Sequence, residues 1–122
     1  MNLNERTVTD LVNSEVERIS QPALLDVIQK LRVTPRSELR AWDYGDENQA
    51  FSCWVVIEHK PSNTCICYCE KGFGPTCPWG LLFISGPHIS MGMDSGWFRT
   101  LEDAVRESTA WEGENPPGYE VG

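Results

Sequence analysis

A chain of 122 residues with 40% hydrophobic side chains and five tryptophans has the composition of one folded domain, which excludes a disordered chain. Its net charge of −8 comes from residues 41–122, because residues 1–40 hold equal numbers of acidic and basic side chains. This acidity would repel a phosphate backbone, so we expect no direct nucleic-acid binding, and it would attract a basic protein partner. There is no secretory pattern at the N-terminus, no apolar run long enough to span a membrane, and an odd number of cysteines. We therefore expect a cytoplasmic protein without a membrane segment.

The N-terminal third reads as helical. Apolar side chains recur at helical spacing over residues 7–19, which predicts an amphipathic helix. Residues 20–22 form a break with a proline that suits the first turn of a second helix. That second helix extends to about Arg32, and Pro35 stops it.

After the helices, the spacing changes to the alternation that is typical of strands. Residues 51–59 and 64–70 are rich in β-branched and aromatic side chains and flank the turn KPSN (60–63), which predicts a β-hairpin. Residues 37–44 predict a strand before this hairpin, and residues 80–85 predict one after it.

The last predicted element is a helix. Thr100 begins the sequence TLED, an N-cap signature, and Gly113 would end the helix that follows. We expect a single α+β domain over residues 1–115 and a mobile tail over residues 116–122. The fold class is an antiparallel sheet of three to four strands, with N-terminal helices and a C-terminal helix packed on it.

Three cysteines alternate along one predicted strand, so Cys65, Cys67 and Cys69 share a face. Structural zinc sites favour two cysteines on a tight C-x₂₋₄-C turn. An extended C-x-C-x-C strand instead spaces its same-face Cα atoms roughly 6.6 Å apart. We therefore expect packed core thiols and no metal site.

The predicted hairpin register, with His59 opposite Thr64, assigns the neighbouring side chains to faces. It places Trp54 and Val56 on the face of the three thiols and Cys53 on the other face. Both faces are apolar, which predicts a central pair of strands covered on each side.

The fifth cysteine raises the possibility of nucleophilic catalysis. Cys77 lies in a Gly- and Pro-rich loop, and His88 follows eleven residues later. Nothing in the sequence positions a third, orienting group, so we predict no catalytic residue and no enzyme, and keep a cysteine-dependent enzyme as a third hypothesis. We expect the loop to tuck Phe73 and Trp79 onto the core.

Acidic and aromatic residues cluster in two predicted loops. Each cluster is either a solvated turn with nearby core side chains or part of a patch where aromatic anchors and acids select a basic partner. The candidate partner-binding residues are Trp42, Asp43, Tyr44, Asp46, Glu47, Asp94 and Trp97.

An alternative function is a small ligand-binding or regulatory domain. In this hypothesis, four aromatic side chains line a pocket over the sheet, because aromatic-lined concavities are frequent small-molecule sites. These are Trp54, Tyr68, Trp79 and Trp97. No sequence pattern indicates a cofactor.

Two stretches, YCEKGFGPTCPWGLLF (68–83) and MGMDSGWFRTLEDAVRESTAW (91–111), resemble those of small acidic immunity proteins of bacterial polymorphic toxin systems. The resemblance implies a cytoplasmic, non-enzymatic protein that binds and neutralises a cognate toxin domain. Such families vary most at the surface that faces the toxin, so the resemblance assigns no binding residue. The acidic charge is consistent with a toxin that has a basic surface, such as a nuclease.

Overall fold

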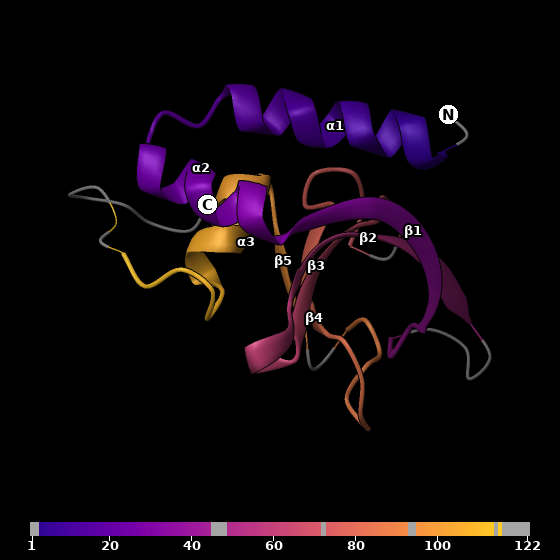
Figure 1. Ribbon diagram of the computed structural model, residues 1–122. Helices are drawn as coiled ribbons and strands as arrows, with labels where there is room; N and C mark the ends of the chain where they lie inside the picture. The colour runs from indigo at the N-terminus through magenta and orange to yellow at the C-terminus, as the bar shows by residue number, and fades with distance from the viewer. Residues whose placement is uncertain (1–2, 45–48, 72, 93–94, 114, 116–122) are drawn as a thin grey trace.

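The computed structural model describes residues 3–44, 49–71, 73–92, 95–113 and 115. The elements are α1 (Glu5–Glu17), α2 (Pro22–Leu31), β1 (Arg32–Ala41), β2 (Ala50–His59), the short 3-10 helix η1 (Lys60–Ser62), β3 (Thr64–Tyr68), β4 (Trp79–Phe83), β5 (Gly96–Phe98) and α3 (Leu101–Glu107). Figure 1 shows the α-helices gathered on one side of a single sheet. The protein is therefore α+β, as predicted.

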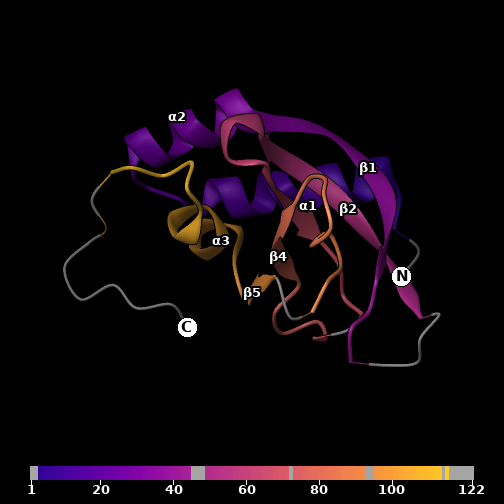
Figure 2. The same cartoon turned by 90° about the horizontal axis from the view of Figure 1, so that it is seen from below.

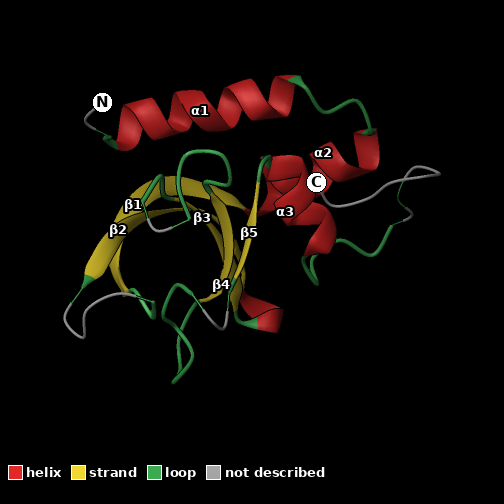
Figure 3. Cartoon of the chain, turned by 180° about the vertical axis from the view of Figure 1, so that it is seen from behind, coloured by secondary structure: helices red, strands yellow, loops and turns green. Residues whose placement is uncertain are grey.

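Within the described residues, the sheet has five antiparallel strands in the order β1-β2-β3-β4-β5. Figure 3 shows this sheet bent into an arch, with the helices over its convex side. We call the convex, helix-covered side the outer face and the concave side the inner face. The predicted count of three to four strands was too low, because β5 has three residues, too few for a detectable alternation.

The first strand also begins earlier than predicted. β1 starts at Arg32, directly after α2, and includes Pro35 instead of following it. Proline is tolerated there because β1 is an edge strand, and the register shifts between Arg32 and Arg36. Pro35 therefore lies within the strand, and it is not the residue that ends α2, which stops at Leu31.

Side chains at the helix starts fix where the helices begin. At α1, the Asn4 side chain accepts a hydrogen bond from the Thr7 backbone N–H at 2.9 Å. Thr100 caps α3 as predicted and accepts from the Asp103 N–H at 3.1 Å. The helix α3 ends at Glu107, well before Gly113, and at its end the Ser108 hydroxyl donates to the Val105 carbonyl at 2.6 Å.

The outer face holds the larger core. Apolar side chains of the helices pack there against side chains from β2 to β5, and each large side chain that is fully buried contributes about 1.5–3 kcal/mol. Its buried members are Val8, Val12, Ile19, Leu24, Ile28, Val56, Ile57, Ile66, Tyr68, Trp79, Phe98, Leu101, Ala104 and Val105.

The inner face holds a second, smaller core, which includes the three strand thiols and Cys53. Its buried members are Cys53, Val55, Cys65, Cys67, Cys69, Leu82 and Met91. A loop after β4 lies over this face in the view from below (Figure 2). Both faces of the central strands are thus covered, as the sequence predicted, although by different means.

A β-bulge in β2 overturns the predicted face assignment of the hairpin. His59 pairs with Thr64 as predicted, but the register shifts between Val55 and Ile57. The extra residue reverses the alternation beyond it, so Val56 packs under the helices and Cys53 joins the inner face.

Candidate functional site

Aromatic rings from separate segments meet at one end of the arch. We call this group the aromatic patch, and its residues are Trp42, Tyr44, Phe51, Phe73 and Trp97. The ring centroids of Trp42 and Phe73 lie 5.0 Å apart, those of Trp42 and Tyr44 lie 5.2 Å apart, and those of Phe73 and Trp97 lie 5.6 Å apart. Such distances are typical of favourable aromatic pairs.

The backbone holds the first of these rings in place. Trp42 follows β1 and forms an isolated parallel bridge with Met91, which belongs to the loop after β4. The Met91 N–H donates to the Ala41 carbonyl at 2.9 Å, and the Asp43 N–H donates to the Met91 carbonyl at 3.3 Å. Met91 is fully buried, so this bridge ties the patch to the inner core.

A glycine positions the ring of Trp97. Gly80 in β4 pairs with Trp97 in β5, and a Cβ atom at Gly80 would stand 2.6 Å from the indole ring. The ring therefore lies directly over the strand, where any side chain would displace it. The Trp97 Nε1–H also donates to the Ser95 hydroxyl at 2.8 Å, which fixes the orientation of the ring.

The patch presents part of its apolar surface to solvent. Tyr44 is 60% exposed and Phe73 is 42% exposed, whereas Trp42 and Trp97 are half-buried beneath them. Large aromatic side chains that are held in position and still exposed are characteristic anchors of protein–protein interfaces.

The prediction that Phe73 and Trp79 both tuck onto the core is half wrong. Trp79 is buried under the helices, but Phe73 points into the patch from the loop after β3. That loop leaves the sheet at the end where β1 finishes, so Phe73 meets Trp42 there. The sequence signal was a large aromatic side chain between glycines, which favours exposure at a loop tip as much as burial.

The structure brings together the predicted site residues that it describes. Phe73, which the sequence did not assign to the site, packs against Trp42, Tyr44 and Trp97 and so joins the two predicted clusters. Asp43 is exposed, and its carboxylate accepts a hydrogen bond from the Ser90 hydroxyl at 2.9 Å. The remaining candidates, Asp46, Glu47 and Asp94, lie outside the described residues.

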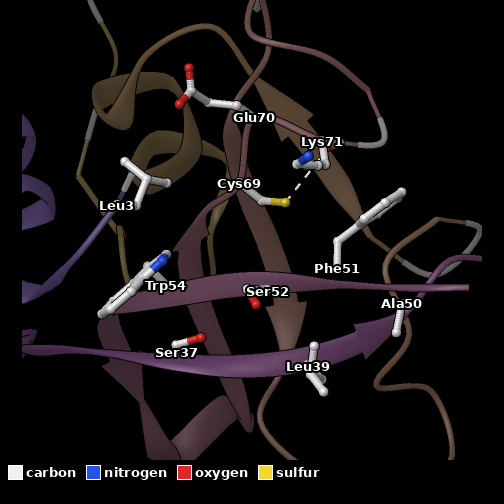
Figure 4. A pocket seen from close by; sticks show the side chains of 10 residues that line it. All are labelled: Leu3, Ser37, Leu39, Ala50, Phe51, Ser52, Trp54, Cys69, Glu70 and Lys71. Atoms are coloured by element: carbon white, nitrogen blue, oxygen red, sulfur yellow. Dashed lines mark hydrogen bonds between the residues drawn. The ribbon is translucent and has the colours of Figure 1, made fainter. Parts of the chain in front are cut away.

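A groove on the outer face adjoins the patch (Figure 4). It lies where the helices leave β1 and β2 uncovered, has a volume of about 640 Å³, and is lined by residues that include Leu39, Trp54, Glu70 and Lys71. Leu39 is 74% exposed there. Phe51 lines the groove and also belongs to the aromatic patch, so the two surfaces are continuous.

The aromatic pocket expected over the sheet does not form from its four predicted residues. The rings of Tyr68 and Trp79 pack against each other at 4.9 Å within the outer core. Trp97 packs against the inner core, on the opposite face, and Trp54 alone of the four lines the groove.

A buried arginine closes the inner face. Arg40 donates to the carbonyls of Phe83 and Ile89 at 2.7 and 2.8 Å and pairs with Glu38 at 2.8 Å. Because Ile89 belongs to the loop after β4, these bonds hold that loop over the thiols. The buried guanidinium therefore positions this loop through its hydrogen bonds.

The strand thiols lie in contact with one another. The sulfurs of Cys65 and Cys67 are 3.9 Å apart, and their hydrogen bond lowers the pKa of Cys65 and raises that of Cys67. Among the described residues, no group of three or more His, Cys, Asp or Glu side chains has the arrangement of a metal site.

Cys77 and His88 flank opposite ends of β4. Cys77 is half-buried and precedes the strand, whereas His88 is exposed and follows it. Five residues of extended strand span roughly 13 Å, which places the two loops at different ends of the sheet.

No family model matches the chain, and searches of curated proteins and of solved structures returned no match. No described helix has the length and apolar character needed to cross a membrane.

Proposed function

We propose that this chain is a non-enzymatic, cytoplasmic binding protein of the immunity class, which neutralises a cognate bacterial toxin through the aromatic patch. The observation that carries the proposal is the exposure of Tyr44 and Phe73 on top of rings that are already fixed in place. Preorganised anchors lose little conformational entropy on binding, and tyrosine and tryptophan dominate the energetics of many interfaces.

The charge of the chain supports a partner with a basic surface. Asp43 lies beside the exposed ring of Tyr44, and residues 41–122 carry the whole net charge of −8. Acidic side chains near an apolar binding surface speed association with a basic partner and disfavour an acidic one. A toxin domain that binds nucleic acid has such a surface.

The test is the affinity for the product of the gene immediately upstream, measured by calorimetry with purified proteins. Phe73→Ala removes an exposed ring from the patch, and we expect it to raise Kd about 10–30-fold, the effect of losing a hot-spot contact of about 2 kcal/mol. Phe83→Ala is the matched control, because Phe83 is similarly exposed at 37% but lies at the end of β4, outside the patch.

Two results would overturn the proposal. An equal loss of affinity for Phe83→Ala and Phe73→Ala would show that the aromatic patch is not the binding surface. No complex between the wild-type chain and the neighbouring gene product, or any other toxin domain, would remove the immunity function itself.

A further inference from the structure

Two cysteines of the inner face lie directly opposite each other on neighbouring strands. The last pair in the register of β2 and β3 joins Trp54 to Tyr68, and one further step along both strands places Cys53 opposite Cys69. The backbone N–H of Cys69 donates to the Pro78 carbonyl at 2.9 Å, on the side of β4. Because the N–H and C=O of one strand residue point to the same side, Cys69 makes its backbone bonds toward β4 and none toward β2. Cys53 and Cys69 therefore form a non-hydrogen-bonded pair.

We propose that Cys53 and Cys69 are an oxidisable dithiol, which a peroxide converts to a cross-strand disulfide in the folded protein. The Cα atoms of a non-hydrogen-bonded antiparallel pair stand about 4.5 Å apart, within the range of about 4.4–6.8 Å that disulfides require. Both side chains belong to the inner core, on the same face of the sheet, so a bridge between them needs no change of strand register.

The neighbouring pair, Cys65 and Cys67, shows why a disulfide should form between strands and not within one strand. The sulfurs of Cys65 and Cys67 also approach each other, at 3.9 Å, but both residues belong to β3. Their Cβ atoms project in parallel from positions about 6.6 Å apart, whereas a disulfide needs a Cβ separation of about 3.5–4.5 Å. A bridge there would require β3 to bend.

The surroundings favour Cys69 as the sulfur that reacts first. Cys69 follows the end of β3 and, although only 1% exposed, is one of the residues that line the groove, next to Lys71 (Figure 4), whereas Cys53 is not. The interaction between the two thiols lowers the pKa of Cys69 and raises that of Cys53. The Cys69 thiolate is thus the better nucleophile of the pair.

The oxidation proceeds in two balanced steps. The Cys69 thiolate attacks one oxygen of hydrogen peroxide and the O–O bond breaks. Hydroxide is released, and Cys69 becomes a sulfenic acid. The Cys53 sulfur then attacks the Cys69 sulfur, the S–O bond breaks, and water leaves. Two thiols and one peroxide have become one disulfide and two waters.

The test treats the reduced, full-length protein with hydrogen peroxide and maps its peptides by mass spectrometry. We expect two of the five thiols to disappear, the chain to lose the mass of two hydrogen atoms, and the crosslink to join residues 53 and 69. Cys53→Ser should abolish this crosslink, whereas Cys65→Ser should retain it. Circular dichroism before and after oxidation establishes that each protein is folded.

Mapping of the wild-type chain decides the matter even if a variant fails to fold. A folded protein that keeps both thiols free overturns the proposal. So does a crosslink between any other two cysteines, including Cys69 with Cys77, or oxidation of Cys69 to a sulfinic acid without a crosslink.

Discussion

The two faces of one sheet are filled in opposite ways. The outer face carries large side chains such as Ile66 and Trp79, and helices complete its core. The buried side chains of the inner face are four cysteines with Val55, Leu82 and Met91, and a loop that Arg40 holds in place closes this face. Side chains converge on the concave side of an arch and diverge on the convex side. Small residues therefore suit the inner face, and large ones suit the outer face.

We expect this difference between the two faces to separate stability from the proposed recognition of a partner. The outer core joins every α-helix to the sheet, so it carries most of the apolar burial. The inner core extends outward into the aromatic patch, because Trp42, Phe51 and Trp97 pack against it. Changes on the outer face should affect mainly the free energy of unfolding, whereas changes on the inner face should also alter the patch.

The largest expected effect comes from placing a charge on the inner face. Cys67→Asp introduces a carboxylate at a fully buried position, and the nearby cation, Arg40, is already bonded to Glu38 and to the carbonyls of Phe83 and Ile89. The carboxylate must therefore protonate or disrupt the sheet. We expect the variant to be unfolded or insoluble at neutral pH, as measured by circular dichroism. Ser52→Asp, at an exposed position of β2, is the control and should fold normally. A cooperatively folded Cys67→Asp protein would show that the inner face is not a packed core.

Truncation on the outer face should come next. Ile66→Ala removes a buried side chain between the helices and the sheet and should lower the free energy of unfolding by about 2–5 kcal/mol. Denaturant unfolding with the same m-value as the wild type would measure it. A loss below about 1 kcal/mol would mean that the helices are loosely packed on the sheet.

Removing the buried guanidinium should have a smaller effect. Arg40→Met leaves the carbonyls of Phe83 and Ile89 without their donor, at a cost of about 1–3 kcal/mol for a buried acceptor that loses its partner. Arg36→Met is the control, because Arg36 is 44% exposed and its ion pairs with Glu38 and Glu58 should contribute at most about 1 kcal/mol. Equal losses in the free energy of unfolding for the two variants would show that Arg40 does not hold the loop in place.

The smallest expected effect is truncation on the inner face. Cys67→Ala removes one sulfur from the position next to Ile66 on the same strand, so we expect a loss of about 1 kcal/mol, comparable to removing a single methyl group. The comparison with Ile66→Ala, made by the same denaturant titration, isolates the contrast between the two faces. A decrease in the free energy of unfolding as large as that of Ile66→Ala would contradict the contrast between the two faces.

Local patterns in the sequence predicted much of this fold. The Thr100 cap, the pairing of His59 with Thr64, and the α+β class follow from short-range rules that the structure confirms. The β-bulge next to Val56 has no mark in the sequence, because any apolar residue can occupy it. One unpredicted residue therefore moved Cys53 to the other face of the sheet.

The candidate site was predictable in its parts but not in its assembly. Trp42, Tyr44 and Trp97 stood out as aromatic residues near acids, but their meeting depends on long-range contacts. The bridge from Met91 to Trp42 and the insertion of Phe73 join loops that are far apart in the chain. Periodicity and turn rules describe neighbours in sequence, so they cannot place such contacts.

The central claim is that the inner core and its aromatic patch form the recognition surface, while the helices on the outer face provide stability. Hydrogen–deuterium exchange of the chain, alone and in complex with the proposed partner from the neighbouring gene, tests this directly. We predict slower exchange on binding in the segments around Tyr44 and Phe73, with little change in α1 and α2. Slower exchange confined to these helices would contradict the claim.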